Sequence, residues 1–375
     1  MDVSSELIHS LLPVFMVSIL GASVLQVGWI EGVAESTALI VKVFSGALSD
    51  FLGRRKGLAV FGYGLAALTK PLFALAATLD VVFTARMLDR IGKGIRGAPR
   101  DALLADLTPV GIRGTAFGLR QALDAVGATL GPCLAMAFMW WWADQFRAVF
   151  WIAVIPAVAS VALLAFGLKE PAPAQRERRT NPIRRENLRK LGKTYWWITV
   201  IGAAITLARF SEAFLILRAQ QLGVAIAFVP LVLVLMSLAF SLSAYPFGKL
   251  SDRVDRRGLL VIGLIILVAA DLLLALASTW WMVFLGATLW GIHLGATQGL
   301  IAAMVADAAP KELRGTAFGF FNLVCGLATL FASVIAGLLW DWFGSDATFG
   351  AAAGFCIFAI VVLTIGRRPS SSSPR

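Results

Sequence analysis

The stretch Gly46-Ala-Leu-Ser-Asp50 returns later in the chain as Gly248-Lys-Leu-Ser-Asp252, shifted by 202 residues. A second stretch, Arg113-Gly-Thr-Ala-Phe-Gly118, returns as Arg314-Gly-Thr-Ala-Phe-Gly319, shifted by 201 residues. Two motifs in the same order at nearly the same offset indicate that the chain contains two copies of one unit. Parallel repeats related by an axis along the membrane normal occur in transporters, with the substrate site between the repeats.

The composition agrees with a membrane protein. Of the 375 residues, 59% are hydrophobic and only 15% are charged, whereas a soluble domain has about 45–50% apolar and about 25% charged residues. A single soluble core could not bury this much apolar surface, so the composition excludes a water-soluble enzyme as well as a disordered chain. The sequence shows no nucleophile–base pair, metal-binding cluster or nucleotide loop, and we expect no catalytic residue, metal or cofactor.

Apolar runs separated by breaks predict twelve transmembrane helices of about 20 residues each. The runs cover residues 3–20, 27–48, 57–77, 80–104, 115–139, 147–168, 195–218, 226–247, 258–277, 280–305, 315–340 and 347–366. We therefore expect an all-α membrane protein with two pseudo-symmetric six-helix bundles. The expected parts are an N-terminal bundle at 1–168, a basic cytoplasmic linker at 169–194, a C-terminal bundle at 195–366 and a cytoplasmic tail at 367–375.

The net charge of +11 is mostly a signal of topology. Basic residues gather in alternate loops, above all in the segment between the sixth and seventh spans, and the intervening loops carry few charges. Because Lys and Arg are retained on the cytoplasmic side, this pattern predicts that both termini lie in the cytoplasm. The excess charge gives no evidence for a nucleic-acid partner.

The segment Gly46-Ala-Leu-Ser-Asp-Phe-Leu-Gly-Arg-Arg-Lys56 resembles the signature loop between the second and third helices of the major facilitator superfamily. The copy from Gly248 to Arg257 is degenerate, with Asp255 where the family has glycine. Twelve spans, the duplication and the central basic segment extend the resemblance over the whole chain. It implies the twelve-helix major facilitator fold and transport by alternating access.

The resemblance also implies a gating role for the loop, in which an acidic residue clamps the two bundles together in one state and releases them in the other. The residues that match are Gly46, Asp50, Gly53 and Arg54, with Asp252 in the second copy. The alternative is that the basic residues of the loop only anchor the topology.

The fifth span matches the family's antiporter signature at Gly118, Gly127, Gly131 and Pro132, with Ala135 in place of the last glycine. In the family, this pattern is associated with exporters that exchange substrate for protons. The alternative is a helix-packing seam, since small residues allow close approach of helices and proline bends them.

The fourth span carries five basic residues, Arg86, Arg90, Lys93, Arg96 and Arg100. At about 100° per residue, they fall within an arc of about 120° on one helix face. A charge at membrane depth costs at least about 2.5–3.5 kcal/mol and normally faces a partner or a water-filled cavity, so this stripe cannot face lipid. Arg90 also matches part of the family's fourth-helix motif. We expect Arg96 and Arg100 to form structural pairs, and Arg90 and Lys93 either to pair or to line a cavity.

Carboxyl groups near these cations are the candidates for carrying a proton, because burial and a neighbouring cation shift the pKa of a carboxyl in opposite directions. The set comprises Glu6, Glu31, Glu35, Asp124 and Glu212. Arg209 precedes Glu212 by three residues, so these two could be a simple pair. The alternative for Glu31 is that it is only a rim residue near the outer surface. The lone His293 is expected to pack in the interior, and the alternative is a pH-sensitive group in the cavity.

The favoured function is secondary active transport of a small solute by proton-coupled efflux across a prokaryotic-type inner membrane, by a monomer in the lipid bilayer. The basic stripe suggests that the solute is anionic or carries an anionic group. The alternatives are proton-linked uptake of an organic anion and a membrane sensor that keeps the fold without transport. Because the first span is short, we also expect either a start upstream of Met1 or a shortened first helix.

Overall fold

The computed structural model of the chain describes residues 1–52, 55–107, 113–142, 145–168, 191–251, 254–310 and 313–365. Within this part of the chain, every regular element is a helix. The helices of the first half are α1 (Asp2–His9), α2 (Leu12–Ser18), α3 (Val24–Leu52), α4 (Arg55–Leu75), α5 (Leu79–Leu107), α6 (Arg113–Trp141), α7 (Phe146–Ile152) and α8 (Val154–Gly167).

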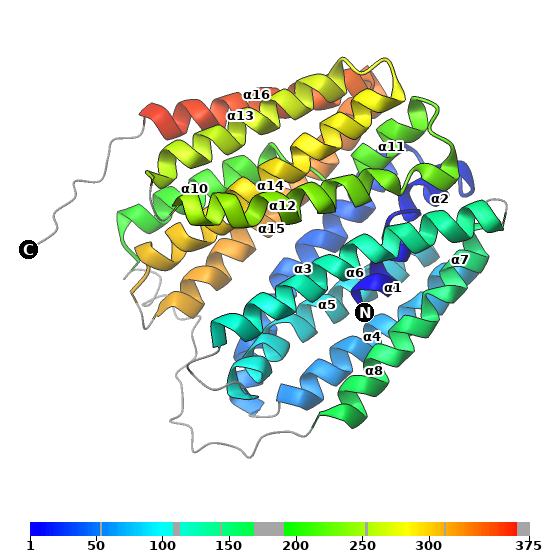
Figure 1. Ribbon diagram of the computed structural model, residues 1–375, viewed down its shortest axis with the longest axis horizontal. Helices are drawn as coiled ribbons and strands as arrows, with labels where there is room; N and C mark the ends of the chain where they lie inside the picture. Colours follow the sequence, from blue (N-terminus) through cyan, green and yellow to red (C-terminus); the bar gives the residue numbers. More distant parts are fainter. Residues whose placement is uncertain are drawn as a thin grey trace, which may run out of the picture.

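The second half repeats this order. Its helices are α10 (Lys193–Leu207), α11 (Ala213–Gln221), a 3₁₀ helix (Ile226–Phe228), α12 (Leu231–Ser251), α13 (Arg256–Ala275), α14 (Trp280–Ala308), α15 (Arg314–Phe343) and α16 (Ser345–Ile365). Figure 1 shows the long helices running roughly alongside one another, with the first half below the second.

Three of the predicted spans are each broken into two α-helices, and the eighth begins with the 3₁₀ helix, so the described helices do not match twelve spans one for one. The all-α membrane fold is confirmed. The first span breaks before α2, where Pro13 lies in the first turn, a position that suits a residue without an N–H donor. The sixth breaks at Ala153, two residues before Ile155-Pro156. The seventh breaks over residues 208–212.

Nine helical segments in the described residues are long and apolar enough to cross a membrane. Helix α5, in the middle of the first half, is not one of these nine segments, because it contains the predicted basic stripe. This helix instead packs against α3 and α4, so its charges lie inside the protein.

The two halves meet along α3 and α15, which pack together over most of their length. A Cβ atom at Gly28 of α3 would lie 2.5 Å from the Ser333 carbonyl oxygen of α15, and one at Gly337 would lie 2.8 Å from the Leu25 Cα atom. Glycine is therefore required at both positions for the helices to approach this closely. On the other side of the boundary, α6 contacts α12 and the 3₁₀ helix.

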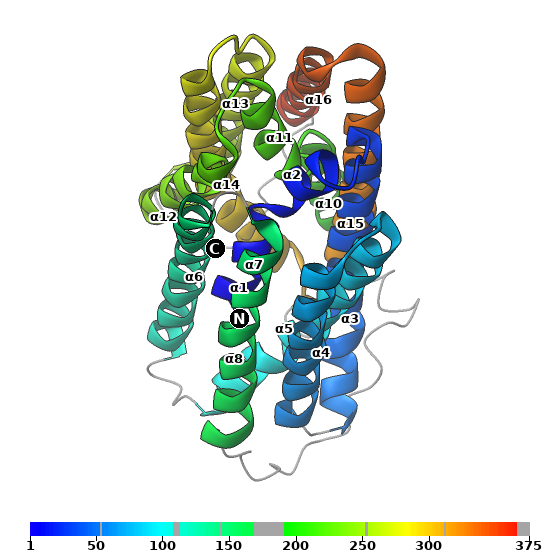
Figure 2. The ribbon, with the colours of Figure 1, turned by 90° about the vertical axis from the view of Figure 1, so that its right-hand side faces the viewer.

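One end of this boundary is closed by hydrogen bonds between the halves. The Gln220 side-chain amide at the end of α11 donates to the Ser18 hydroxyl of α2 at 2.6 Å. The Leu25 backbone N–H donates to the Asp341 carboxylate at 3.2 Å. In Figure 2, which is seen from this end, α2 and α11 lie next to each other between the two halves.

Candidate functional site

A cluster of ionisable side chains surrounds the middle of α5. We call it the α5 charge cluster, and its members are Glu6, His9, Glu31, Glu35, Lys70, Arg86, Asp89 and Arg90. They come from α1, α3, α4 and α5. Four separate helices thus bring their charges to one place in the first half of the chain.

Arg86 joins the cluster to α3. Its guanidinium donates to Glu31 at 2.6 Å and lies 3.3 Å from Glu35. Glu31 is completely buried. The alternative that Glu31 is only a residue of the outer rim was therefore wrong, because the face of α3 that carries Glu31 packs against α5 and not toward the surface.

Arg90 forms the centre of the cluster. Its guanidinium lies 3.1 Å from Glu35 and 3.6 Å from Asp89, and the side chain is 1% exposed. Lys70 of α4 contacts Asp89 at 2.8 Å and donates to the Ser5 hydroxyl of α1 at 3.0 Å. The sequence-based predictions did not include Lys70 among the site residues, although a lone lysine within an apolar span is the signal of a buried charge.

His9 links α1 to α3. Its Nδ1 atom lies 3.3 Å from Glu6, and its Nε2 atom lies 3.5 Å from Glu31. His9 was also missed in the sequence. Ligand atoms of His9, Glu31 and Glu35 all lie within 4.8 Å of one another, close enough to hold a metal ion. Arg86 already contacts both carboxylates, so a cation would have to compete with its guanidinium.

The charges of the cluster do not balance without a proton. Its carboxylates are Glu6, Glu31, Glu35 and Asp89, whereas its permanent cations are Lys70, Arg86 and Arg90. Among the ion-paired members, four negative charges therefore face three positive ones, and one proton, on His9 or on a carboxyl, makes this set neutral. Lys93 forms no ion pair in the cluster, although it acts electrostatically on Glu6 and Glu35. Buried charges are costly unless they are compensated, so the arrangement favours the binding of one proton.

The remaining members of the basic stripe differ in their contacts. Arg96 lies over the ring of Tyr63, 4.8 Å from its centre, and 3.7 Å from Asp2. Arg100 lies 3.4 Å from Asp101 and 3.5 Å from Asp124. Lys93 is exposed and has no ion-pair partner within the described residues. The prediction that this face avoids lipid is consistent with these contacts.

Asp124 on α6 lies apart from the α5 charge cluster. It pairs with Arg120 at 2.9 Å and with Arg100. It also lines a hollow of about 390 Å³, together with Asp2, Gly127 and several apolar side chains. The structure thus places Asp124 in a second, more exposed ion cluster between α5 and α6.

The glycines of the fifth span position α1. A Cβ atom at Gly131 would lie 2.8 Å from the Val3 carbonyl oxygen and from the Cβ atom of Glu6, and one at Gly127 would lie 3.0 Å from Asp2. Pro132 is buried inside α6. The small residues of this span therefore let α1 bring Glu6 against α6.

The second half contributes Arg209 and Glu212 from the break between α10 and α11. Neither side chain has an ion-pair or hydrogen-bond partner among the described residues, and the Nη1 atom of Arg209 is buried without a partner. The two therefore do not form the simple pair that their spacing suggested. Glu212 interacts electrostatically with Glu6 and Glu35 across the boundary.

Of the predicted gating residues, Gly46 is described, and a Cβ atom there would make an ordinary contact of 3.4 Å with Ala98 of α5. Gly53, Arg54 and Asp252 lie outside the described residues, and for Asp50 only the helical backbone is described. Their gating role stays a prediction.

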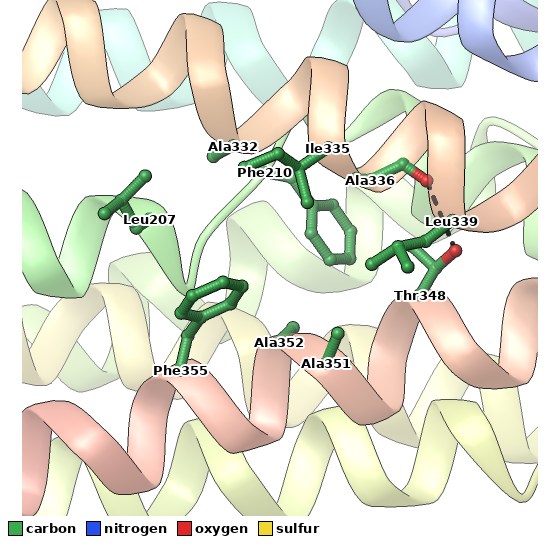
Figure 3. A pocket seen from close by; sticks show the side chains of 10 residues that line it. All are labelled: Leu207, Phe210, Ala332, Ile335, Ala336, Leu339, Thr348, Ala351, Ala352 and Phe355. Carbon is green, nitrogen blue, oxygen red and sulfur yellow. Dashed lines mark hydrogen bonds between the residues drawn. The ribbon is translucent and has the colours of Figure 1, made fainter.

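An apolar pocket in the second half lies among α10, α15 and α16 (Figure 3). Its one polar side chain is Thr348, whose hydroxyl already donates to the Ala336 carbonyl oxygen at 3.3 Å. This pocket offers no charge to an ionic solute, so the α5 charge cluster and the nearby break in the second half are the stronger candidate site.

Comparisons with known proteins agree with this architecture. The model of the Major Facilitator Superfamily matches residues 2–219 and 198–375. An MFS-type transporter of Methanocaldococcus jannaschii is 33% identical over 90% of this chain and 85% of its own length. A protein of Mycobacterium tuberculosis is 29% identical over 86% of this chain and 80% of its own length.

Among solved structures, a POT family transporter in complex with a thioalcohol-conjugated peptide superposes with a TM-score of 0.80 and 13% identity, over 97% of this chain and 92% of that chain. This likeness shows the fold. The family match confirms the resemblance and the expectation of a multi-pass membrane transporter instead of an enzyme. The chain belongs to the Major Facilitator Superfamily.

Proposed function

We propose that this protein exports a small solute carrying an anionic group, in exchange for protons, across a cytoplasmic membrane. The observation that carries the proposal is the charge count of the α5 charge cluster, in which four carboxylates face three permanent cations. A site that is neutral only with one added proton is suited to coupling proton movement to transport.

Glu6 is the residue that we assign to the coupling proton. Its only ion-pair partner among the described residues is His9, and its side chain is 22% exposed. Glu31 and Glu35 contact arginines, and Asp89 contacts Lys70. A carboxylate held by a permanent cation resists protonation, and Glu6 is the carboxyl of the cluster whose ion-pair partner, a histidine, can itself become neutral. The carboxyl group of Glu212, in the second half, interacts electrostatically with Glu6.

The anionic group of the solute is assigned to Lys93 and Arg209. These cations come from opposite halves, and neither has an ion-pair partner within the described residues. The other cations of the stripe contact carboxylates. Only cations without such partners gain a full charge-assisted contact when an anion binds.

Alternating access follows from the boundary between the halves. The end closed by the Ser18–Gln220 hydrogen bond lies opposite the loops that carry the basic residues, which we place in the cytoplasm. We infer that residues 1–168 and 195–366 rock as two bundles joined by 169–194, and that Asp50, Arg54 and Asp252 clamp the cytoplasmic side. The protein acts as a monomer with both termini in the cytoplasm.

The proposal is tested in proteoliposomes that contain purified protein and a pH-sensitive dye. Organic anions are first selected by their ability to raise the thermal stability of the protein, since a ligand that binds the folded state stabilises it. An outward gradient of such an anion should drive protons into the vesicles. Proton movement in the same direction as the anion would support uptake instead, and a stabilising anion that crosses without protons would contradict the coupling.

A further inference from the structure

The duplication places different chemistry at one buried position of the two halves. Lys70 on α4 and Asp89 on α5 correspond, with a shift of 201 residues, to Asp271 on α13 and Trp290 on α14. In the first half, the Lys70 ammonium lies 2.8 Å from Asp89. In the second half, the Trp290 indole N–H donates to Asp271 at 3.2 Å.

The surrounding backbone is also equivalent. Gly62 of α4 and Gly263 of α13 are related by the same shift, and both lie at a close helix crossing. A Cβ atom at Gly62 would lie 2.8 Å from the Arg96 backbone nitrogen of α5, and one at Gly263 would lie 2.5 Å from the Thr297 side chain of α14. The side chains at the two positions therefore differ within a common helix arrangement.

Asp271 has no cation to balance it. The residue is completely buried, and its Oδ2 atom has no hydrogen-bond partner. No lysine, arginine or histidine lies within ion-pair distance of it in the described part of the chain. The buried titratable groups on the helices that pack against α13 are His293 of α14, which contacts the Gly263 carbonyl oxygen, and Cys356 of α16, which donates to the Leu264 carbonyl oxygen. The other titratable groups described on these helices are exposed, and they are Tyr245, Lys249, Asp307 and Asp346.

A lone ionised carboxylate in such a position is far more costly than a neutral acid with one unsatisfied hydroxyl. We propose that Asp271 is a proton-binding site and holds a resident proton. The second half then has a neutral carboxylic acid where the first half has a lysine–aspartate ion pair. The neutral acid still accepts the Trp290 hydrogen bond through Oδ1 and keeps the proton on Oδ2.

This proton is distinct from the one proposed to couple transport. Asp271 is completely buried between helices of the second half, whereas Glu6 is partly exposed. The inference does not depend on the proposed transport cycle, and its test measures no transport.

Infrared spectroscopy of the purified full-length protein tests the inference, because protonated carboxylic acids absorb in a range separate from carboxylates. We expect the spectrum of the Asp271→Asn variant, subtracted from that of the wild type at neutral and mildly alkaline pH, to show one lost carboxylic-acid band. The matched control is Asp89→Asn in the equivalent pair of the first half, which should remove carboxylate bands only. Loss of carboxylate bands in Asp271→Asn would overturn the inference.

A second variant covers the case in which Asp271→Asn does not fold. In protein labelled with ¹³C-aspartate, Asp271→Glu should remove the isotope-shifted acid band and add an unshifted one from the new glutamic acid. If the labelled wild type shows no acid band that Asp271→Glu removes, the inference is wrong. Thermal unfolding adds an independent readout, in which Asp271→Asn should lower the Tm much less than Asp89→Asn.

Discussion

The guanidinium of Arg90 on α5 lies 3.1 Å from the carboxylate of Glu35 on α3, with the Arg90 side chain 1% exposed. This contact ties the charged helix to the helix that forms the boundary with the second half, since α3 packs along α15. A change in the charge of the α5 charge cluster therefore acts on a helix at the boundary that opens and closes in the proposed transport cycle.

Replacing Arg90 by alanine should destabilise the protein strongly, because Glu35 and Asp89 would lose a buried cation. Breaking a buried ion pair from one side costs about 3–5 kcal/mol. The Tm of the purified variant measures this effect. The matched control is Arg256→Ala, which removes a more exposed pair with Asp307, where the loss should be about 0–1 kcal/mol. Equal effects of the two substitutions would contradict the structural role of Arg90.

Substituting Gly131 by valine should displace α1 from α6. The added Cβ atom would lie 2.8 Å from the Val3 carbonyl oxygen, and overpacking of this kind costs about 1–3 kcal/mol. Because α1 carries Glu6, transport should fall together with the Tm. Gly64→Ala on α4 is the control, since a Cβ atom there meets nothing within 4 Å. A variant at Gly131 with normal stability and transport would refute the packing role.

Changing Lys93 to glutamine should weaken solute binding without affecting stability, because Lys93 is exposed and lacks an ion-pair partner in the described residues. Loss of a hydrogen bond to a charged group, worth about 1.5–3 kcal/mol, predicts an increase in KM of at least about tenfold. Lys42→Gln on the exposed part of α3 is the control. An unchanged KM in Lys93→Gln would remove Lys93 from the binding site.

Joining Ser18 to Gln220 should stop transport. Both are replaced by cysteine in a protein whose natural cysteines, Cys133, Cys325 and Cys356, are changed to alanine, and a short cleavable thiol crosslinker connects them. Their side chains lie 2.6 Å apart in the closed end of the boundary, which opens in the proposed transport cycle. Cleavage of the linker should restore transport. Continued transport in the crosslinked protein would show that this end does not open.

The sequence predicts the helical spans and the basic stripe well, because apolar length and helical periodicity are local properties. It fails where partners come from distant helices. Lys70 and His9 are single polar residues whose importance depends on Asp89 and Glu31. The face of α3 that packs inward, which buries Glu31, is likewise a property of the assembled helices.

Arg209 and Glu212 illustrate a second kind of failure. A spacing of three residues places side chains side by side on a helix. These two residues lie in the break between α10 and α11, so the rule does not apply and they remain separate. The repeat motifs did predict the duplication, yet they do not indicate that Lys70 and Asp271 occupy equivalent positions with different chemistry.

The most direct test of the coupling proton uses the Glu6→Gln variant in proteoliposomes, with Asp80→Asn at the exposed start of α5 as the control. Removing the Glu6 carboxylate leaves three carboxylates with three permanent cations in the α5 charge cluster, so no added proton is needed for neutrality. We predict that the variant still exchanges the solute across the membrane but no longer moves protons with it, whereas the control does both. Solute-driven proton movement at the wild-type rate in Glu6→Gln would contradict the account.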